Sequence, residues 1–386
     1  MSVLLLWIAG VVALAVAWWA FRRPRPRASS DELARLRASV APLPRTAAAR
    51  TTAPTTSTHA PAAPAPQPTP AAQPTPPELA AFAWQAESDL DPARRDGLLA
   101  AVRGIPRPPR SMQQLLSPEF LASASSADLS ELVMAEPLIA AKVLSTVNGP
   151  YYGLHKPVTG IGQAVTFLGI NTVRSICLQY MLAEAFKPKL AEAQRAFDTI
   201  WKASAIASEL AVRLGKALNL PEQGTLSTQV VLGFVGQLAT ASLIPPAGLG
   251  QWLERDRLAR ARIEQDLLGL SASEVGSLLM KSWELPASLV GDVADCGRLL
   301  VTPPGQIDAA RLPRLALGYL CARLGERLAL GQLDSLESYV PANDPSLDMH
   351  HLRHALSHPA LLRLDGALQS NELQAALRQM LGQAGA

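Results

Sequence analysis

The sequence has few aromatic residues, few charged residues and few cysteines, and each shortage excludes a class of protein. Of its 386 residues 5% are aromatic, 17% are charged and 48% are apolar, and abundant alanine and leucine favour helices over sheets. The formal net charge of +3 is too small to indicate nucleic acid as a partner. Cys177, Cys296 and Cys321 stand far apart without a CxxC pair, so neither a disulfide nor a zinc site is expected, and free thiols suit a reducing cytosol.

The first residues lack charge altogether. No side chain from Ser2 to Phe21 is charged, and a helix of that length rises about 30 Å, enough to cross a membrane. The arginines that follow at once (Arg22, Arg23, Arg25 and Arg27) predict that the carboxyl side is cytoplasmic. The alternative is a cleaved signal peptide, because Ala15-Val16-Ala17 is a small-x-small site, but no Lys or Arg precedes the apolar run.

The rest of the chain divides by composition. Residues 23–90 are rich in Pro, Ala and Thr and predict a disordered linker. A helical domain is expected over 91–302, beginning where Asp91 caps a helix with Pro92 as its first residue. Residues 303–386 predict a helical extension, which either joins the same bundle or forms a small appended unit. The fold class is therefore all-α, after one transmembrane helix over residues 1–22.

Helical periodicity is clearest between residues 128 and 181. Ser126 or Asp128 is expected to cap a first helix, and Pro137 to begin a second one that is apolar around nearly its whole circumference and therefore buried. A third helix is expected to break at Gly169, and Asn171 to cap a fourth. Farther along, residues 225–244 predict a central buried helix. A charged segment over 252–268 predicts an exposed helix.

These residues carry a resemblance to a known family. The stretches EPLIAAKVLSTVNGPYYG (136–153) and GIGQAVTFLGINTVRSICL (160–178) resemble the HDOD domain, a bacterial signalling module related to HD-type phosphohydrolases. A Trp-x-Leu-Pro ending at 283–286 extends the resemblance to roughly residues 95–300. It implies a multi-helix HDOD-like bundle in a bacterial protein. The residues that carry the signature are Pro137, Leu138, Asn148, Gly153, Gln163, Ala164, Leu168, Gly169, Trp283 and Pro286.

The resemblance to HD enzymes also implies metal ligands, which the sequence does not supply. Such enzymes hold a divalent metal with histidines and an adjacent His-Asp pair, so that the metal can activate water. None of the six histidines falls between Lys156 and Met349. A last ligand position falls near Asp295 or Cys296. We therefore expect no catalytic residue, metal or cofactor, and the resemblance places the vestigial HD-site positions at Ala203, Gly236, Gln237 and Ala272.

A histidine cluster near the carboxyl terminus needs separate consideration. His350, His354 and His358 are four residues apart and would share one helix face, a spacing that can bind zinc. Pro359 and the solvent-facing neighbours favour a surface helix without metal. The role of this face and of the extension stays open.

Together these features predict a non-catalytic signalling module tethered to the inner membrane by one N-terminal span, with its helical domain in the cytoplasm. Its partner is expected to be an unidentified signalling protein rather than nucleic acid, and homo-oligomer formation stays open. Tyr151, Tyr152 and Arg174 are the surface candidates for partner binding, although the tyrosines could equally pack within their turn. The alternative is a divergent HD-type phosphohydrolase or a nucleotide-binding sensor that uses the vestigial pocket.

Overall fold

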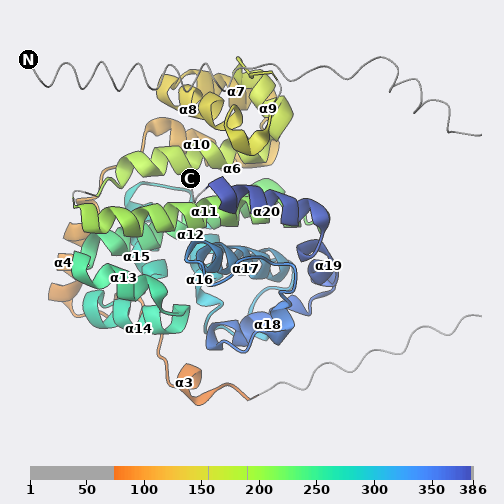
Figure 1. Ribbon diagram of the computed structural model, residues 1–386. Coiled ribbons are helices and arrows are strands. Elements are labelled where there is room, and N and C mark those ends of the chain that lie inside the picture. Colours follow the sequence, from red (N-terminus) through yellow and green to blue (C-terminus); the bar gives the residue numbers. More distant parts are fainter. Residues whose placement is uncertain (1–73, 155, 189, 384–386) are drawn as a thin grey trace, which may run out of the picture. The chain divides into compact units, whose positions relative to one another are not determined.

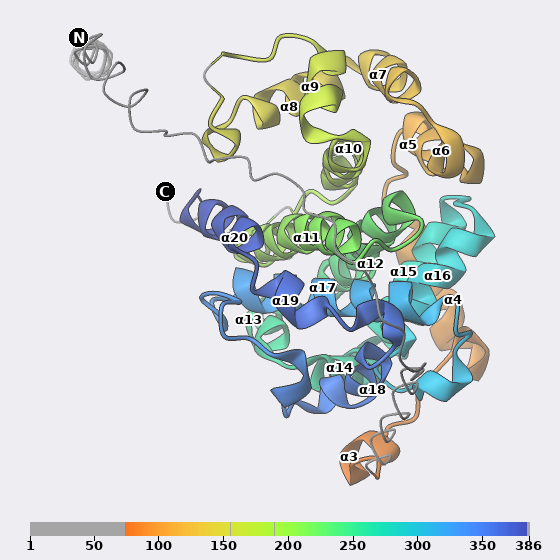
Figure 2. The same ribbon diagram turned by 90° about the vertical axis from the view of Figure 1, so that its right-hand side faces the viewer.

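This computed structural model describes residues 74–154, 156–188 and 190–383 (Figures 1 and 2). The predicted membrane span and most of the linker lie outside these residues. All regular structure in the described part is helical, with no strand, which agrees with the predicted fold class. The chain enters through helices α3 (Pro77–Ala80), α4 (Pro92–Arg103), α5 (Arg110–Leu115) and α6 (Pro118–Ser123), with a 3-10 turn η1 (Glu87–Asp89).

The linker was expected to reach residue 90, but residues 76–90 lie against the helical domain. Leu79 is buried, and the Trp84 indole N–H donates to Glu274 Oε1 at 2.8 Å. The predicted cap at Asp91 is confirmed, because its side chain accepts the backbone N–H of Arg94 at 2.9 Å. The domain therefore begins before Asp91.

Four helices form the part that carries most of the family signature. Ser125, rather than Ser126 or Asp128, caps α7, and Asp128 completes a capping box with it. Pro137 begins the next helix and Gly169, at φ +83°, separates the last two, as predicted, but Gly169 rather than Asn171 is the cap. In both views this group lies at one end, with α10 beside α11 (Figures 1 and 2). The helices are α7 (Ser126–Met134), α8 (Pro137–Val147), α9 (Ile161–Leu168) and α10 (Ile170–Ala185), with η2 (Pro150–Tyr152) before α9.

The second of these helices is not fully buried, although its sequence predicted that it would be. Ile139, Val143 and Val147 face the core, whereas Leu138 is 70% exposed. Because α8 is apolar on nearly all sides but buried on only one, part of its apolar surface is exposed to solvent.

The centre of the domain is a bundle of long helices. The helix α11 packs along α12 and α17, and α12 also packs against α15 and α16. The central buried helix predicted over 225–244 is confirmed as α12. The bundle helices are α11 (Ala191–Ala217), α12 (Gln223–Leu243), α15 (Ala272–Ser282), α16 (Ala287–Arg298) and α17 (Leu312–Ala329), and α13 (Pro246–Glu254) and α14 (Arg257–Leu268) connect α12 to α15.

Among the described residues, α12 is the one single helix that is long and apolar enough to cross a membrane, and the helix pair α9–α10 passes the same test only as a span bent by 117°. The most apolar window of α12 is 78% buried in the domain. Burial of this kind is what a core helix shows.

The carboxyl-terminal extension belongs to the same bundle. Its first helix, α17, is one of the core helices, and α19 and α20 pack against α11. Figures 1 and 2 both show α20 beside α11. The remaining elements are α18 (His350–Leu356), α19 (Leu364–Leu368) and α20 (Asn371–Gln383), with 3-10 turns η3 (Pro304–Gln306), η4 (Pro341–Asn343), η5 (Leu347–Met349) and η6 (Pro359–Leu361).

Candidate functional site

Three of the four vestigial positions line one cavity. Gly236 and Gln237 on α12 and Ala272 at the start of α15 surround a space of about 100 Å³, with Cys296 of α16 at another wall. Ala203 lies apart from it on α11, where its carbonyl faces Gly325 of α17. The structure therefore brings together most of the positions that the family resemblance selected, although they come from separate parts of the chain.

The packing at Gly236 leaves no room for a ligand side chain. A Cβ atom at this position would lie 2.0 Å from the carbonyl oxygen of Ala272, and one at Gly276 would lie 2.8 Å from the Cα of Gly236. A Cβ atom that close to a non-bonded backbone atom would clash with it. The backbones of α12 and α15 thus meet at a position that the family resemblance aligns with a metal-binding histidine.

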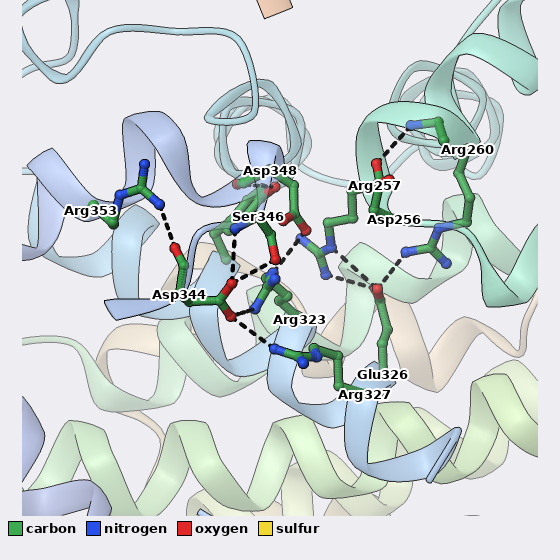
Figure 3. A network of polar contacts seen from close by, with 12 residues as sticks. Asp256, Arg257, Arg260, Arg323, Glu326, Arg327, Asp344, Ser346, Asp348 and Arg353 are labelled. Carbon is green, nitrogen blue, oxygen red and sulfur yellow. Dashed lines mark hydrogen bonds and ion pairs between the residues drawn. The ribbon is translucent and has the colours of Figure 1, made fainter. Parts of the chain in front are cut away.

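At the neighbouring position, Gln237 contacts a buried carboxylate. Its Nε2 donates to Glu326 Oε1 at 2.7 Å. The same carboxylate accepts from Nη2 of Arg257 at 2.7 Å and from Nη2 of Arg260 (Figure 3). Beside the vestigial position, therefore, two guanidinium groups supply the positive charge around one carboxylate.

The protonation of Glu326 follows from these contacts. Burial alone would raise the pKa of the Glu326 carboxyl, but the charges of Arg257 and Arg260 outweigh it and lower the pKa to about 2. The carboxylate is therefore charged at neutral pH. A buried ion pair of this kind is strongly destabilised when one partner is removed.

A second carboxylate, Glu264, fixes the start of α15. Its Oε2 accepts the backbone N–H of Ala272 at 2.6 Å and its Oε1 accepts the indole N–H of Trp252 at 2.9 Å. Burial raises its pKa, against the opposing effect of those donors and of Arg260. Glu264 thus holds Ala272, one of the vestigial positions, through one hydrogen bond from its backbone N–H.

The prediction that the charged helix over 252–268 is exposed is wrong. Arg260, Glu264 and Gln265 of α14 are buried. Arg260 pairs with Glu326 of α17, Glu264 accepts from Ala272 and Trp252, and Gln265 donates to the carbonyl of Ala83. No periodicity within the helix itself reveals those partners.

The residues that the structure describes contain no group of three His, Cys, Asp or Glu side chains placed to hold a metal. Helix α18 ends at Leu356, so His358 lies beyond it and its Nδ1 accepts the backbone N–H of Ala360 at 3.2 Å. His350 is buried, contrary to the surface helix that we expected. The three histidines therefore do not share one exposed helix face. At the last ligand position, Asp295 pairs with Arg311 at 2.6 Å.

The two tyrosines of the signature turn are half-buried and contact each other. Their rings are 4.6 Å apart and edge-on, and the Tyr151 hydroxyl donates to Glu209 Oε1 at 3.2 Å. Glu209 also accepts from Arg213 Nε at 2.6 Å. Burial raises the pKa of both tyrosines, with the charge of Glu209 adding to it. Both are therefore neutral phenols at physiological pH.

Tyr152 lies between two cavities. One, of about 340 Å³, also contains Tyr151, Ser175 and Met380 in its wall. The other, of about 520 Å³, contains Phe167, whose ring is 6.4 Å from that of Tyr152 and 53% exposed. The tyrosines thus pack within their turn and also face accessible space, and their role in partner binding stays a prediction.

Arg174 is not on the surface, contrary to expectation. The residue is 2% exposed, and its guanidinium lies near the Phe120 ring and the α12 backbone at Gly224. Burial lowers its pKa. From this position its side chain contacts α6 and α12, and its Nε is buried without a hydrogen-bond partner among the described residues.

The other signature residues have structural roles. The side chain of Asn148 clamps the loop before α9, with its Nδ2 donating to the carbonyl of Val158 and its Oδ1 accepting the N–H of that residue, both at 2.7 Å. Gln163 Oε1 accepts the backbone N–H of Thr159 at 3.2 Å, and Gly153 has φ +57°. Trp283 is buried and Pro286 precedes α16. The signature thus specifies turns rather than a chemical site.

Sequence reasoning missed Arg257, Arg260 and Glu326, which surround the vestigial position at Gln237. The signal available was the pair of arginines three residues apart on α14. Glu326 was hidden in the extension that resembled no known family. Its 66-residue separation from Arg260 lies beyond any local pattern.

Comparisons with known proteins identify the family of the helical domain. The model of the HDOD domain family matches residues 105–296, and no curated protein matches the chain. An HDOD domain protein of unknown function from Geobacter sulfurreducens is 17% identical, with a TM-score of 0.51, over 74% of this chain and 98% of that one. A protein of Shewanella amazonensis SB2B, whose name carries a provisional phosphohydrolase assignment, is 22% identical, with a TM-score of 0.47, over 74% and 97%. The MmoQ response regulator of Methylococcus capsulatus is 20% identical, with a TM-score of 0.31, over 69% and 98%.

Proposed function

Because residues 105–296 form an HDOD domain, we propose that this chain is a non-catalytic signalling module that acts through protein–protein contacts. The observation that carries the proposal is the vestigial site. Gly236 has no room for a side chain, and Gln237 is engaged with Glu326, which two arginines neutralise. The carboxylate beside this position is therefore already held by two guanidinium groups, whose positive charges disfavour a metal ion there.

The alternative, a nucleotide-binding sensor or a divergent hydrolase, has less support at this site. Ligand pockets ordinarily measure about 300–1,000 Å³, whereas the cavity at the vestigial positions measures about 100 Å³. Part of its wall comes from α12 and α15, whose backbones meet at Gly236 and Gly276. A nucleotide would therefore need the bundle to open.

The exposed apolar side chains indicate where a partner would bind. Met134, Leu138 and Phe167, which are 60%, 70% and 53% exposed, all lie on α7, α8 and α9. They form half of the large apolar side chains that are exposed in the described part of the chain. Apolar surface left in solvent commonly marks an interaction site. We name these three residues the α7–α9 surface and place the partner contact there.

A metal and activity assay tests the non-catalytic part of the proposal. The purified chain is expected to carry no stoichiometric divalent metal and to hydrolyse no phosphodiester when manganese, iron or magnesium is supplied. Metal analysis by mass spectrometry and product release from a generic phosphodiester measure both. Stoichiometric metal together with turnover would show that the chain is an enzyme.

A matched pair of surface variants tests the partner contact. Leu138→Asp is expected to abolish recovery of the partner when the tagged chain is purified from its own cells. Leu362→Asp, at a residue that is 75% exposed at the end of η6 and outside α7–α9, is expected to leave recovery unchanged. Equal recovery with both variants would contradict the assignment of the α7–α9 surface.

The tether is also part of the proposal and rests on the sequence alone. The uncharged run from Ser2 to Phe21 and the arginines after it favour one span with the helical domain in the cytoplasm. A carboxyl-terminal reporter that is active only in the cytoplasm measures this orientation. Activity only of a periplasm-dependent reporter would contradict it.

A further inference from the structure

Helix α20, near the carboxyl end of the chain, covers the signature turn of the HDOD domain. The match to the HDOD family ends at residue 296, so α20 lies outside that domain. It packs against η2 and α11, and both views show it along α11 (Figures 1 and 2). Gln379 Nε2 donates to the carbonyl of Pro150 at 3.1 Å. A helix from outside the family domain thus occupies the turn that carries the two tyrosines.

Both cavities beside Tyr152 have α20 as part of their wall. Met380 lines the cavity of about 340 Å³, and Glu372 and Leu373 line the cavity of about 520 Å³. Helix α20 therefore lies over one continuous groove of the HDOD domain, built from η2, α10 and α11. We name it the tyrosine groove, and the residues of the domain that line both cavities are Tyr152, Thr172, Glu209 and Val212.

Helix α20 fills the tyrosine groove only in part. Leu377 is 1% exposed, whereas Met380 is only half-buried. The two cavities remain between the helix and the groove, although protein interiors leave few voids larger than a water molecule. Besides the bond from Gln379, the one side-chain hydrogen bond between α20 and these elements in the described chain joins Arg213 Nη1 to Glu372 at 3.1 Å. The Glu372 side chain is 85% exposed, so this pair contributes little to stability.

The charges of the tyrosine groove favour a helix with an acidic first turn. The charged side chains that line the two cavities are Glu209, Arg213 and Lys216 from α11 and Glu372 from α20. Arg213 Nε donates to Glu209 Oε1 at 2.6 Å, so these two charges offset each other and Lys216 leaves the groove with one positive charge. Glu372, in the first turn of α20, supplies the opposite charge. A helix that replaces α20 needs an acid at the same place.

We propose that the tyrosine groove binds an amphipathic helix of a partner protein, which replaces α20. This helix carries an acid in its first turn and apolar residues at the spacing of Leu373, Leu377 and Met380, with the last one larger than methionine so that it fills the smaller cavity. Helix α20 is then an autoinhibitory segment, because the partner has to displace it. The groove shares only Phe167 with the α7–α9 surface. Leu138→Asp alters that surface alone, so the two proposals can fail separately.

A fluorescent peptide of residues 369–383 tests the groove in full-length chains. Leu377→Asp places a charge on the buried face of α20 and so detaches the chain's own helix. This variant is expected to bind the peptide with saturation at one site in fluorescence anisotropy. The unaltered chain is expected to bind it about tenfold more weakly or less, because its tethered α20 competes at an effective concentration on the order of millimolar. Absence of saturable binding to folded Leu377→Asp, or equal binding by both chains, would overturn the assignment.

Matched changes in the peptide test the fit to the groove. Met380→Trp is expected to bind about tenfold more tightly, since the larger side chain fills the cavity of about 340 Å³. Ala375→Trp places the same side chain at an exposed position of α20. Its effect is expected to stay below about twofold, as for surface substitutions in general. Equal effects of the two tryptophans would contradict the proposed way of filling the groove.

A third peptide tests the acidic first turn. Glu372→Lys faces Arg213 and Lys216 and is expected to bind about threefold more weakly at low salt, with the difference shrinking as salt is added. Binding that does not change with this reversal of charge would contradict the requirement for an acid.

Hydrogen exchange of the unaltered full-length chain tests the displacement of α20 without a peptide. Its amides are expected to exchange roughly a hundredfold faster than those at the centre of α11, through an opening that leaves the bundle folded. In the full-length chain, Met380→Trp is expected to slow this exchange about tenfold and Ala375→Trp to leave it unchanged. This pair decides the question even if Leu377→Asp does not fold. Equal protection of α20 and α11 would show a permanent core helix and overturn the proposal.

The oligomeric state separates a partner helix from α20 of a second copy. The unaltered full-length chain is expected to sediment as a monomer. Exchange of α20 between copies would instead give a dimer that Leu377→Asp abolishes. Such a dimer would assign the tyrosine groove to a second copy and overturn the assignment to a partner.

Discussion

Gly236 and Gly276 bring the backbones of α12 and α15 into direct contact, so that a Cβ atom on Gly276 would lie 2.8 Å from the Cα of Gly236. This contact lies in the vestigial site. The position that the family resemblance aligns with a metal-binding histidine therefore has a packing role of its own. Reversal to histidine would require these two helices to separate.

Gly236→Ala is expected to destabilise the domain by about 3 kcal/mol, because the new Cβ would meet the backbone oxygen of Ala272, which cannot move aside as a flexible side chain can. Gly233→Ala is the control on the same helix, where a Cβ meets no atom within 4 Å. It is expected to stabilise by up to about 1 kcal/mol through helix propensity. Urea denaturation followed by circular dichroism measures both, and equal effects would contradict the role of the contact.

Glu326→Gln is expected to lower the free energy of unfolding by about 3 kcal/mol at pH 7, because Arg257 and Arg260 lose their shared carboxylate. The pKa of Glu326 is lowered from 4.5 to about 2 in the folded chain. Its contribution is therefore fully present above pH 4.5 and is lost as the pH falls towards 2.

The difference in the free energy of unfolding between the unaltered chain and Glu326→Gln therefore tests this pH dependence. It is expected to shrink steadily between pH 4.5 and pH 2 in urea titrations. Asp344, whose pKa is also lowered to about 2, titrates in both proteins and cancels in the comparison. A difference that stays constant over this range would show that the Glu326 carboxylate is not the group that matters.

Cys177 and Cys321 are expected to resist a thiol reagent such as Ellman's reagent at pH 8. Both are buried free thiols, and burial raises the pKa of Cys177 to about 12 and raises that of Cys321 as well. The reactive thiolate is therefore scarce at pH 8, and the reagent has no access. All three cysteines are expected to react in urea, and rapid reaction of all three in the folded chain would contradict the burial of these two.

Local sequence rules predicted the turns of this fold better than they predicted which side chains are buried. Pro137 and Gly169 act where they stand, through a missing N–H and a positive φ, so a single sequence shows their effect. The burial of Arg260 depends instead on Glu326, and that of Arg174 depends on α12. Such pairs form only when distant helices meet, and periodicity cannot report them. Leu138 shows the converse, an apolar side chain that remains exposed because no segment among the described residues covers it.

The residues of the candidate site likewise fall into those that the sequence could predict and those that it could not. The vestigial positions on α12 and α15 could be chosen from the sequence because the family resemblance runs through those helices. The arginines and the carboxylate around them could not, since Glu326 comes from α17, which the resemblance does not reach. Tertiary contact, rather than local pattern, therefore determines the charge of this site.

A fragment spanning residues 91–386 is expected to be less stable than one spanning 74–386, by about 3 kcal/mol. The shorter fragment loses the burial of Leu79, the hydrogen bond from Trp84 to Glu274 at 2.8 Å, and the bond from Gln265 Nε2 to the carbonyl of Ala83 at 2.9 Å. Loss of one buried leucine side chain alone costs about 2–5 kcal/mol. Urea denaturation of the two fragments measures the difference. Trp84→Phe in the longer fragment keeps the apolar contact but loses the hydrogen bond, so it is expected to lower the free energy of unfolding by about 1 kcal/mol. Coincident unfolding of all three proteins would show that residues 76–90 do not stabilise the domain.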